Sequence, residues 1–367
     1  MNSPLIRDHM PELDVVRGIA VLLVVFLHGM ALPLHGELSP FGRVLYNLSQ
    51  YGWVGVNLFF VLSGFLITGI LLDCRHRPDY FRRFYIRRAL RILPALYAVL
   101  LILQITGLAS FPFIAVSFLF LANFAGLLGI AKGYGVLWSL AVEEHFYMLW
   151  PFIVHKCSLR KLLTLTIMIC LGSPFLRSLL LVHPVPKHFA SLYTWFNLDG
   201  LSLGALLAIW LRMPAFRRYQ LTRVALPALI LGSAAFVMLA GHPWADVTVA
   251  KTACNLASAG FLSCALLAGT SKWKALVDWS IFKFFGFISY GLYLIHIIAF
   301  HVMSILLSHY LAGSLTRNPL TAMLLQFCGG LVLATAVAYL SRRSLEERFL
   351  RIGYSSRRVK LLTPSFV

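Results

Sequence analysis

Apolar residues occur along this chain in long runs separated by short polar or basic segments. Each run is close to the ~20 residues that an α-helix needs to cross the hydrocarbon core of a bilayer. Eleven such runs can be delimited: 12–34, 53–72, 90–108, 111–129, 137–155, 162–182, 190–211, 223–241, 250–269, 281–307 and 321–341. The pattern predicts an all-α polytopic membrane protein.

The charges at the two ends of the chain limit how many runs can cross. Arg7 precedes the first run and several Arg and Lys residues follow the last, so both termini are predicted to be cytoplasmic. Eleven crossings would place the termini on opposite sides. The run 111–129 is interrupted by Pro112, Asn123, Gly126 and Gly129. We interpret it as a re-entrant or interfacial segment, which leaves about ten spans; failure of a different run to cross is the alternative.

The charges of the loops agree with this topology. The basic segments fall on the predicted cytoplasmic side: 73–91, 156–161, 212–223 and 270–283. The loops predicted on the other side hold few Lys or Arg: 35–52, 109–136, 183–189, 242–249 and 308–320. We expect one transmembrane domain over residues 1–345 and a basic cytoplasmic tail over 346–367.

Composition excludes several other classes of protein. Hydrophobic residues make up 59% of the 367 residues and charged residues only 12%, with a mean hydropathy of +0.81. A soluble domain has about 25% charged residues. The net charge of +19 lies mostly in short loops, which indicates membrane topology and contact with lipids rather than nucleic-acid binding. The six cysteines form no C-x-x-C pair, so no metal site is expected.

The first run carries charged residues in an apolar helix. Arg17 and His28 are eleven residues apart, which places them on nearly one face, roughly 16 Å apart, and Asp14 lies near the same stripe. A charge inside a bilayer is tolerated where it faces a cavity or a partner. Neutral imidazole is a common general base, so His28 is a candidate catalytic residue. The alternative is a histidine satisfied by a backbone carbonyl.

Two adjacent carboxylates, Glu143 and Glu144, lie near the start of the run 137–155. In the ten-span topology, Glu143 reaches a depth similar to that of His28. A carboxylate beside His28 would fix its tautomer and stabilise its imidazolium. The two glutamates point about 100° apart, so at most one faces His28. Alternatively, they are solvated at the interface near a helix start.

A basic stretch leads into the start of the third run and contains Arg83, Arg87, Arg88 and Arg91. Spacings of three and four residues place Arg91 on a shared helix face with Arg88 and with Arg87. Clustered guanidinium groups beside a membrane suit the phosphates of a cofactor. On charge alone, an anchor to anionic lipid headgroups is the favoured alternative.

Other buried polar positions are predicted in later runs. Asp199 lies about halfway along 190–211 and needs a cation or a proton there. Tyr293 and His296 share a helix face, and His296 is a second candidate base, with a hydrogen bond inside the bundle as the alternative. Asn57 needs a buried partner, and the glycines around it favour close helix packing.

Several motifs occur in a fixed order over nearly the whole chain. They are Arg17 and His28 separated by ten residues, the run 59–64, Arg88-Ala-Leu-Arg91 before Pro94, the run 138–143, the run 199–204 and the run 289–296. As a set, the chain resembles the acyltransferase family 3 membrane proteins, which O-acylate bacterial surface glycans. One departure is Asn197, where the family often has an arginine that could pair with Asp199.

The resemblance implies about ten spans and an acyl-CoA donor taken from the cytoplasm. It implies that Arg88 and Arg91 handle the donor, that His28 is essential, that Glu143 belongs to the acceptor side, and that Arg17 supports the same channel. We therefore expect an O-acetyltransferase of the bacterial inner membrane that moves an acetyl group from acetyl-CoA to a carbohydrate hydroxyl. His28 would act as base, or as the carrier of a covalent acyl group. The alternative is a transporter or flippase for a lipid-linked glycan or small anion.

Overall fold

The computed structural model describes residues 5–7, 10–30, 38–179, 192–241, 248–315, 319–349 and 351, and this part of the chain is helical without strands. The α-helices are α1 (Pro11–Gly29), α2 (Pro40–Ser49), α3 (Val54–Cys74), α4 (Tyr80–Thr106), α5 (Phe111–Phe118), α6 (Leu137–Lys156), α7 (Leu159–Leu179), α9 (Leu198–Trp210), α10 (Arg218–Leu239), α11 (Val249–Gly269), α12 (Ser280–Phe287), α13 (Ser289–Leu315) and α14 (Pro319–Ser341). Short turns of 3-10 helix are η1 (Gln50–Trp53), η2 (Ala122–Phe124), η3 (Thr194–Phe196) and η4 (Lys272–Val277), and η5 (Arg342–Glu346) is a π-helical turn. The all-α prediction is confirmed.

Seven described segments are long and apolar enough to cross a membrane: Pro40–Cys74, Tyr80–Thr106, Leu159–Leu179, Arg218–Leu239, Val249–Gly269, Ser289–Tyr310 and Pro319–Phe349. They indicate a multi-pass membrane protein and match seven of the ten predicted spans. The other three predicted spans correspond to α1, α6 and α9. Helix α1 carries three charged residues, Glu12, Asp14 and Arg17, which is too many for an apolar span. Adjacent carboxylates lower the hydropathy of α6, and α9 has only 13 residues. The count of ten and the side of the termini stay predictions.

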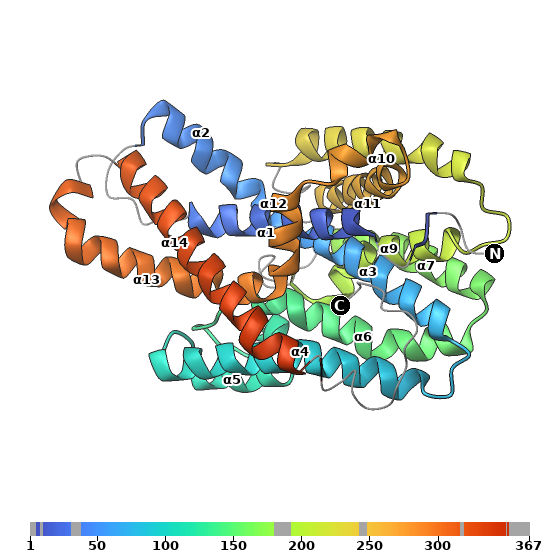
Figure 1. Cartoon of the computed structure of the whole chain (residues 1–367), viewed down its shortest axis with the longest axis horizontal. Helices are drawn as coiled ribbons and strands as arrows, with labels where there is room; N and C mark the ends of the chain where they lie inside the picture. The colour runs from blue at the N-terminus through green and yellow to red at the C-terminus, as the bar shows by residue number, and fades with distance from the viewer. Residues whose placement is uncertain are drawn as a thin grey trace.

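The centre of the bundle is built from α1, α3 and α9. Helix α3 packs against both of the others, α6 packs on α3, and α12 packs on α1. Figure 1 shows α10 and α11 on one side of this centre and α4 and α6 on the other. A Cβ atom on Gly64 would lie 1.8 Å from the carbonyl oxygen of Leu201, and one on Gly55 would lie 2.3 Å from that of Ala20. These glycines therefore permit the close helix packing that the sequence predicted.

The predicted non-crossing run 111–129 does not form one continuous helix. Helix α5 ends at Phe118, and turns with η2 follow it. Eight residues of α-helix extend about 12 Å, which is shorter than a hydrocarbon core of about 30 Å. This length is what a non-crossing segment requires. Its position relative to a bilayer stays a prediction.

The predicted single run 281–307 is wrong as one helix. The structure divides it at Ile288 into α12 and α13. Helix α12 lies against α1, where a Cβ atom on Gly286 would be 2.0 Å from the carbonyl oxygen of Asp14. Because α12 packs against α1, it does not form one continuous helix with α13. The break lies just before the residues predicted to carry chemistry in this run.

The predicted basic tail, 346–367, falls largely outside the described residues. Its first residue, Glu346, is buried at the end of η5, where Arg342 donates a hydrogen bond to it over 3.1 Å. The domain boundary after residue 345 stays a prediction. The loop 183–189 lies outside the described residues, as do most of 242–249 and parts of 35–52 and 308–320.

Candidate functional site

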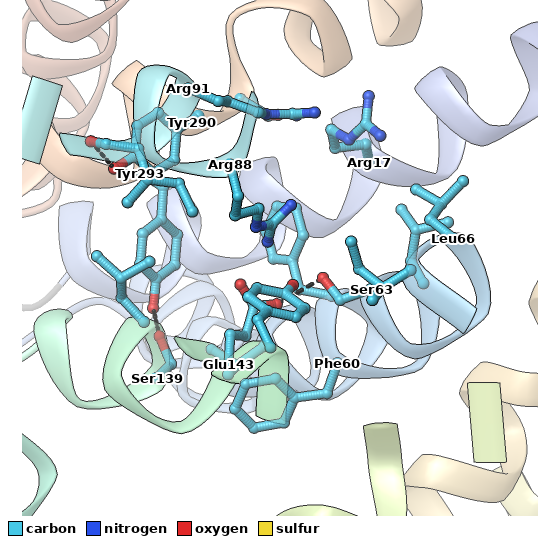
Figure 2. A pocket seen from close by; sticks show the side chains of 18 of the residues that line it. Arg17, Phe60, Ser63, Leu66, Arg88, Arg91, Ser139, Glu143, Tyr290 and Tyr293 are labelled. Carbon is cyan, nitrogen blue, oxygen red and sulfur yellow. Dashed lines mark hydrogen bonds between the residues drawn. The ribbon is translucent and has the colours of Figure 1, made fainter. Parts of the chain in front are cut away.

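A cavity of about 950 Å³ lies between α1, α3, α4, α6 and α13 (Figure 2). Small-molecule and cofactor sites are typically concave and mostly apolar, with a few convergent polar groups. Most of its wall is apolar, but three guanidinium groups and one carboxylate also line it. They belong to Arg17, Arg88, Arg91 and Glu143. The cavity therefore brings together charged residues from α1, α4 and α6 that the sequence predicted as parts of one site.

Glu143 lies at the middle height of the bundle. Ser63 donates a hydrogen bond of 2.6 Å from its Oγ to Oε1 of Glu143. Ser63 is central in α3, which runs from Val54 to Cys74. The carboxylate is therefore placed deep between helices and faces the cavity. The structure does not support the alternative of a glutamate solvated at a helix start.

Arg88 connects the predicted donor cluster to the predicted carboxylate pair. Its Nε lies 3.8 Å from Oε1 of Glu144, whose residue is 8% exposed. Its guanidinium carbon lies 3.7 Å above the centre of the Tyr147 ring, within the range of a cation–π contact. These contacts orient the Arg88 side chain between Glu144 and the cavity. Glu144 therefore supports Arg88, while Glu143 faces the cavity.

Arg17 is oriented by its own helix. Its Nη1 donates a hydrogen bond of 2.8 Å to Oδ1 of Asp14, three residues earlier. This contact confirms that Asp14 and Arg17 share a stripe of α1. The pairing places a guanidinium group with a local counter-charge at the cavity wall.

A second cavity of about 690 Å³ lies beside the first along α4. Its wall contains all four arginines of the predicted donor cluster, namely Arg83, Arg87, Arg88 and Arg91. Arg88 and Arg91 line both cavities. The two cavities therefore share a boundary, and the arginine-rich start of α4 leads toward Glu143.

His28 does not meet Glu143 as predicted. Within the described part of the chain, its Nδ1 lies 2.9 Å from the carbonyl oxygen of Val24 and 3.2 Å from Nε2 of His296. Helix α13 presents His296 to His28, whereas Ser63 is the partner of Glu143. The predicted pair is therefore replaced by two separate contacts. The backbone bond to Val24 was the alternative prediction, and it occurs together with the histidine contact.

Tyr293 lies between the first cavity and the histidine pair. It lines the cavity, and its ring centre is 5.9 Å from that of His296. Its hydroxyl group is hydrogen bonded to the hydroxyl group of Ser139, as Figure 2 shows. The predicted neighbours Tyr293 and His296 thus connect the cavity wall with His28.

Asp199 belongs to a separate buried cluster. Arg177 on α7 holds it with two hydrogen bonds, 3.0 Å to Oδ1 and 2.7 Å to Oδ2, and both side chains are at most 1% exposed. Asn197 instead accepts a hydrogen bond from Lys251. Sequence reasoning missed Arg177, although it is the one charged residue between Lys161 and Lys187. That isolation in an apolar run was the available signal.

The sequence of this chain matches the family model Acyl_transf_3, described as an acyltransferase domain, over residues 10–343. It is 30% identical over 164 residues to the peptidoglycan O-acetyltransferase OatA of Listeria monocytogenes, which covers 40% of this chain and 24% of the relative. It is 33% identical over 167 residues to the putative peptidoglycan O-acetyltransferase YrhL of Bacillus subtilis, and this match covers 39% of this chain and 23% of the relative.

A third relative is the O-acetyltransferase OatA of Staphylococcus aureus, 28% identical over 235 residues, covering 57% of this chain and 36% of the relative. The matches span between about a quarter and a third of the length of these relatives. No solved structure matches the chain. The family match covers the helices that build both cavities, and the chain therefore belongs to the acyltransferase 3 family.

Proposed function

We propose that this protein transfers an acetyl group from acetyl-CoA to a hydroxyl group of a carbohydrate. The observation that carries the proposal is the pair of adjoining cavities that share Arg88 and Arg91. One end is rich in guanidinium groups, and the other end holds Glu143 among apolar side chains. A donor with phosphates at one end and a thioester at the other fits this arrangement, with its phosphates at the arginines and its thioester near Glu143.

The phosphates of the donor bind the arginines of the second cavity. Arg83, Arg87 and Arg91 follow one another at intervals of four residues, so they lie along one face of α4. Guanidinium groups bind phosphate oxygens with two parallel hydrogen bonds. The pantetheine arm then extends past Arg88 into the first cavity. The donor enters from the cytoplasm in the ten-span topology, with both termini on that side.

The chemical step joins an acceptor hydroxyl to the acetyl group. The hydroxyl oxygen attacks the thioester carbonyl carbon while His28 accepts the hydroxyl proton through Nε2. The C–S bond then breaks, and the proton passes from His28 to the sulfur, which leaves as the thiol of CoA. A variant in which His28 carries the acetyl group as an acyl-imidazole uses the same residues.

The acceptor class is proposed from the relatives. Two of them are named as peptidoglycan O-acetyltransferases, one of these as putative, and a third as an O-acetyltransferase. A carbohydrate exported from the cell is the corresponding acceptor here. Helices long and apolar enough to cross a bilayer support a membrane location for such a reaction. The bacterial inner membrane is the proposed one, because acetyl-CoA and glycan precursors both reach it.

The test compares arginines of one helix. Arg83→Gln and Arg91→Gln remove cavity guanidinium groups, whereas Arg82→Gln removes an exposed one that lines neither cavity. Calorimetric titration of purified protein in nanodiscs with acetyl-CoA should show binding weakened about 10- to 100-fold in the first two variants and unchanged in the third, because a hydrogen bond to a charged group contributes about 1.5–3 kcal/mol.

Equal effects in all three variants would indicate that these arginines bind lipid headgroups and not the donor. Release of CoA from acetyl-CoA in the presence of a glycan acceptor separates an acetyltransferase from a transporter, because a transporter leaves the thioester intact. Loss of this release in His28→Gln, in protein that still binds acetyl-CoA, is expected from the proposed base.

A further inference from the structure

The contact between His28 and His296 fixes the roles of their ring nitrogens. Nε2 of His296 lies 3.2 Å from Nδ1 of His28. Each Nδ1 also lies near the carbonyl oxygen four residues earlier on its own helix, 2.9 Å for Val24 and 3.1 Å for Leu292. A carbonyl oxygen only accepts hydrogen bonds, so its neighbour must donate.

His296 is therefore protonated on Nδ1 and is neutral. Its residue is 0% exposed, and its described contacts are Leu292, His28 and the rings of Tyr293 and Phe300. No carboxylate is among these described contacts, so a doubly protonated ring would be a buried cation without a counter-charge, which is costly. A neutral ring with its proton on Nδ1 presents a lone pair at Nε2.

The tautomer of His28 follows from these acceptors. Both groups that face its Nδ1, the Val24 carbonyl and Nε2 of His296, offer lone pairs, so Nδ1 of His28 must carry the proton. In a neutral ring the other nitrogen, Nε2, is then a free base. Within the described residues this Nε2 has no hydrogen-bond partner, and His28 is only half-buried.

We propose that His296 is a positioning residue that holds His28 in the Nδ1-protonated tautomer and leaves its Nε2 lone pair available to the acceptor hydroxyl. This inference rests on the proposed function, in which His28 removes the hydroxyl proton. The Val24 carbonyl also accepts a hydrogen bond within helix α1, whereas Nε2 of His296 comes from another helix. The bond from α13 therefore fixes the direction of the imidazole plane, which a contact within α1 alone leaves adjustable.

The first test reads the tautomer without any need for activity. The purified protein in nanodiscs, labelled with 15N-histidine, is measured by solid-state NMR, which distinguishes protonated from bare ring nitrogens. His28→Gln identifies the His28 signals by their loss. A protonated Nδ1 and a bare Nε2 on His28 support the proposal. A proton on Nε2 overturns it, whatever the enzyme does.

The second test separates positioning from packing. His296→Gln keeps an acceptor near the place of Nε2, whereas His296→Leu keeps the volume and removes the acceptor. We expect His296→Leu to lower kcat for acetyl transfer at least about tenfold, within the ~10²–10⁴ that a general base contributes. We expect His296→Gln to keep most of the activity. Binding of acetyl-CoA should be unchanged in both, because the arginine-lined cavity is separate.

The outcomes for the two histidines are distinguishable. Equal losses in His296→Gln and His296→Leu would mean that His296 only packs, and this would overturn the proposal. If His296→Leu fails to insert into the membrane, the NMR measurement of the His28 tautomer in the unaltered protein still decides whether the proposal holds. Full acetyl transfer by His28→Gln would refute the proposed base and, with it, the catalytic purpose of the pair, while the NMR result would stand on its own.

Discussion

Replacing Asp199 by Asn should destabilise the protein strongly, because the change leaves a buried cation without its counter-charge. Arg177 and Asp199 are at most 1% exposed and are joined by two hydrogen bonds of 3.0 and 2.7 Å. Thr252 adds a third contact of 3.3 Å to Oδ2 of Asp199. An Asn side chain has nearly the same shape, so the effect isolates the charge.

The magnitude follows from the burial of the pair. Removing one partner of a buried ion pair costs about 3–5 kcal/mol, because the remaining charge stays desolvated. Such a loss lowers the folding equilibrium constant by roughly two to three and a half orders of magnitude. The chain also offers a matched control in Arg212 and Asp73, which form a two-bond pair of 2.8 and 2.7 Å. Asp73 is 43% exposed, so Asp73→Asn should cost only about 0.2–1 kcal/mol.

The assay is reversible unfolding in mixed micelles of dodecyl maltoside and sodium dodecyl sulfate, followed by circular dichroism. We expect the unfolding midpoint to fall far more for Asp199→Asn than for Asp73→Asn. The double variant Arg177→Met with Asp199→Leu should be more stable than Asp199→Asn, because it removes both charges from the interior. Equal midpoints for the two Asn variants, or a double variant worse than the single one, would refute the reasoning.

Four further substitutions test the packing and the cavity. Gly64→Ala should lower the unfolding midpoint, because its Cβ would lie 1.8 Å from a carbonyl oxygen of α9. A Cβ on Gly172 would have nothing within 4 Å, so Gly172→Ala should raise the free energy of unfolding by the ~1 kcal/mol of helix propensity. Asn57→Ala should cost about 1–3 kcal/mol in the same assay, because it leaves the buried amide of its α11 partner unpaired. Ser63→Ala removes the hydrogen bond to Glu143 and should lower the rate of CoA release from acetyl-CoA, while an unchanged rate would show that this bond does not orient the carboxylate.

The sequence predicted the helical elements because their hydropathy is a local property. It also identified 111–129 as unlike its neighbours, since proline and glycine interrupt it. It did not predict the break at Ile288, because small residues like those at Gly286 and Ser289 also occur inside unbroken helices of this chain, for example in α11. That break depends on the fit of α12 against Asp14 and its neighbours on α1, and such a fit between distant segments leaves no periodic signal.

For the candidate site, the sequence identified residues but not their partners. Depth along a helix placed His28 and Glu143 at similar heights, and this estimate said nothing of which helices are adjacent. The structure gives His28 a partner on α13 and gives Glu143 a partner on α3. In the same way, Asp199 was expected to need a cation, and the cation comes from Arg177 on α7.

The long helices that carry charged residues explain how the bundle holds its polar groups. Helices α1 and α6 are not among the seven apolar candidates, yet they contribute Arg17 and Glu143 to the cavity wall. A polar group is tolerated inside a membrane only where protein or a cavity surrounds it. The charged residues of these helices therefore require them to be surrounded by others. Helices α12 and α3 pack closely against α1 and so surround it. Helix α6 packs against α3, and this contact places Glu143 beside Ser63. The charged residues of α1 and α6 thus follow from the place of these helices at the cavity, whereas most of α7, α10 and α14 is not covered by other helices and is free to face lipid.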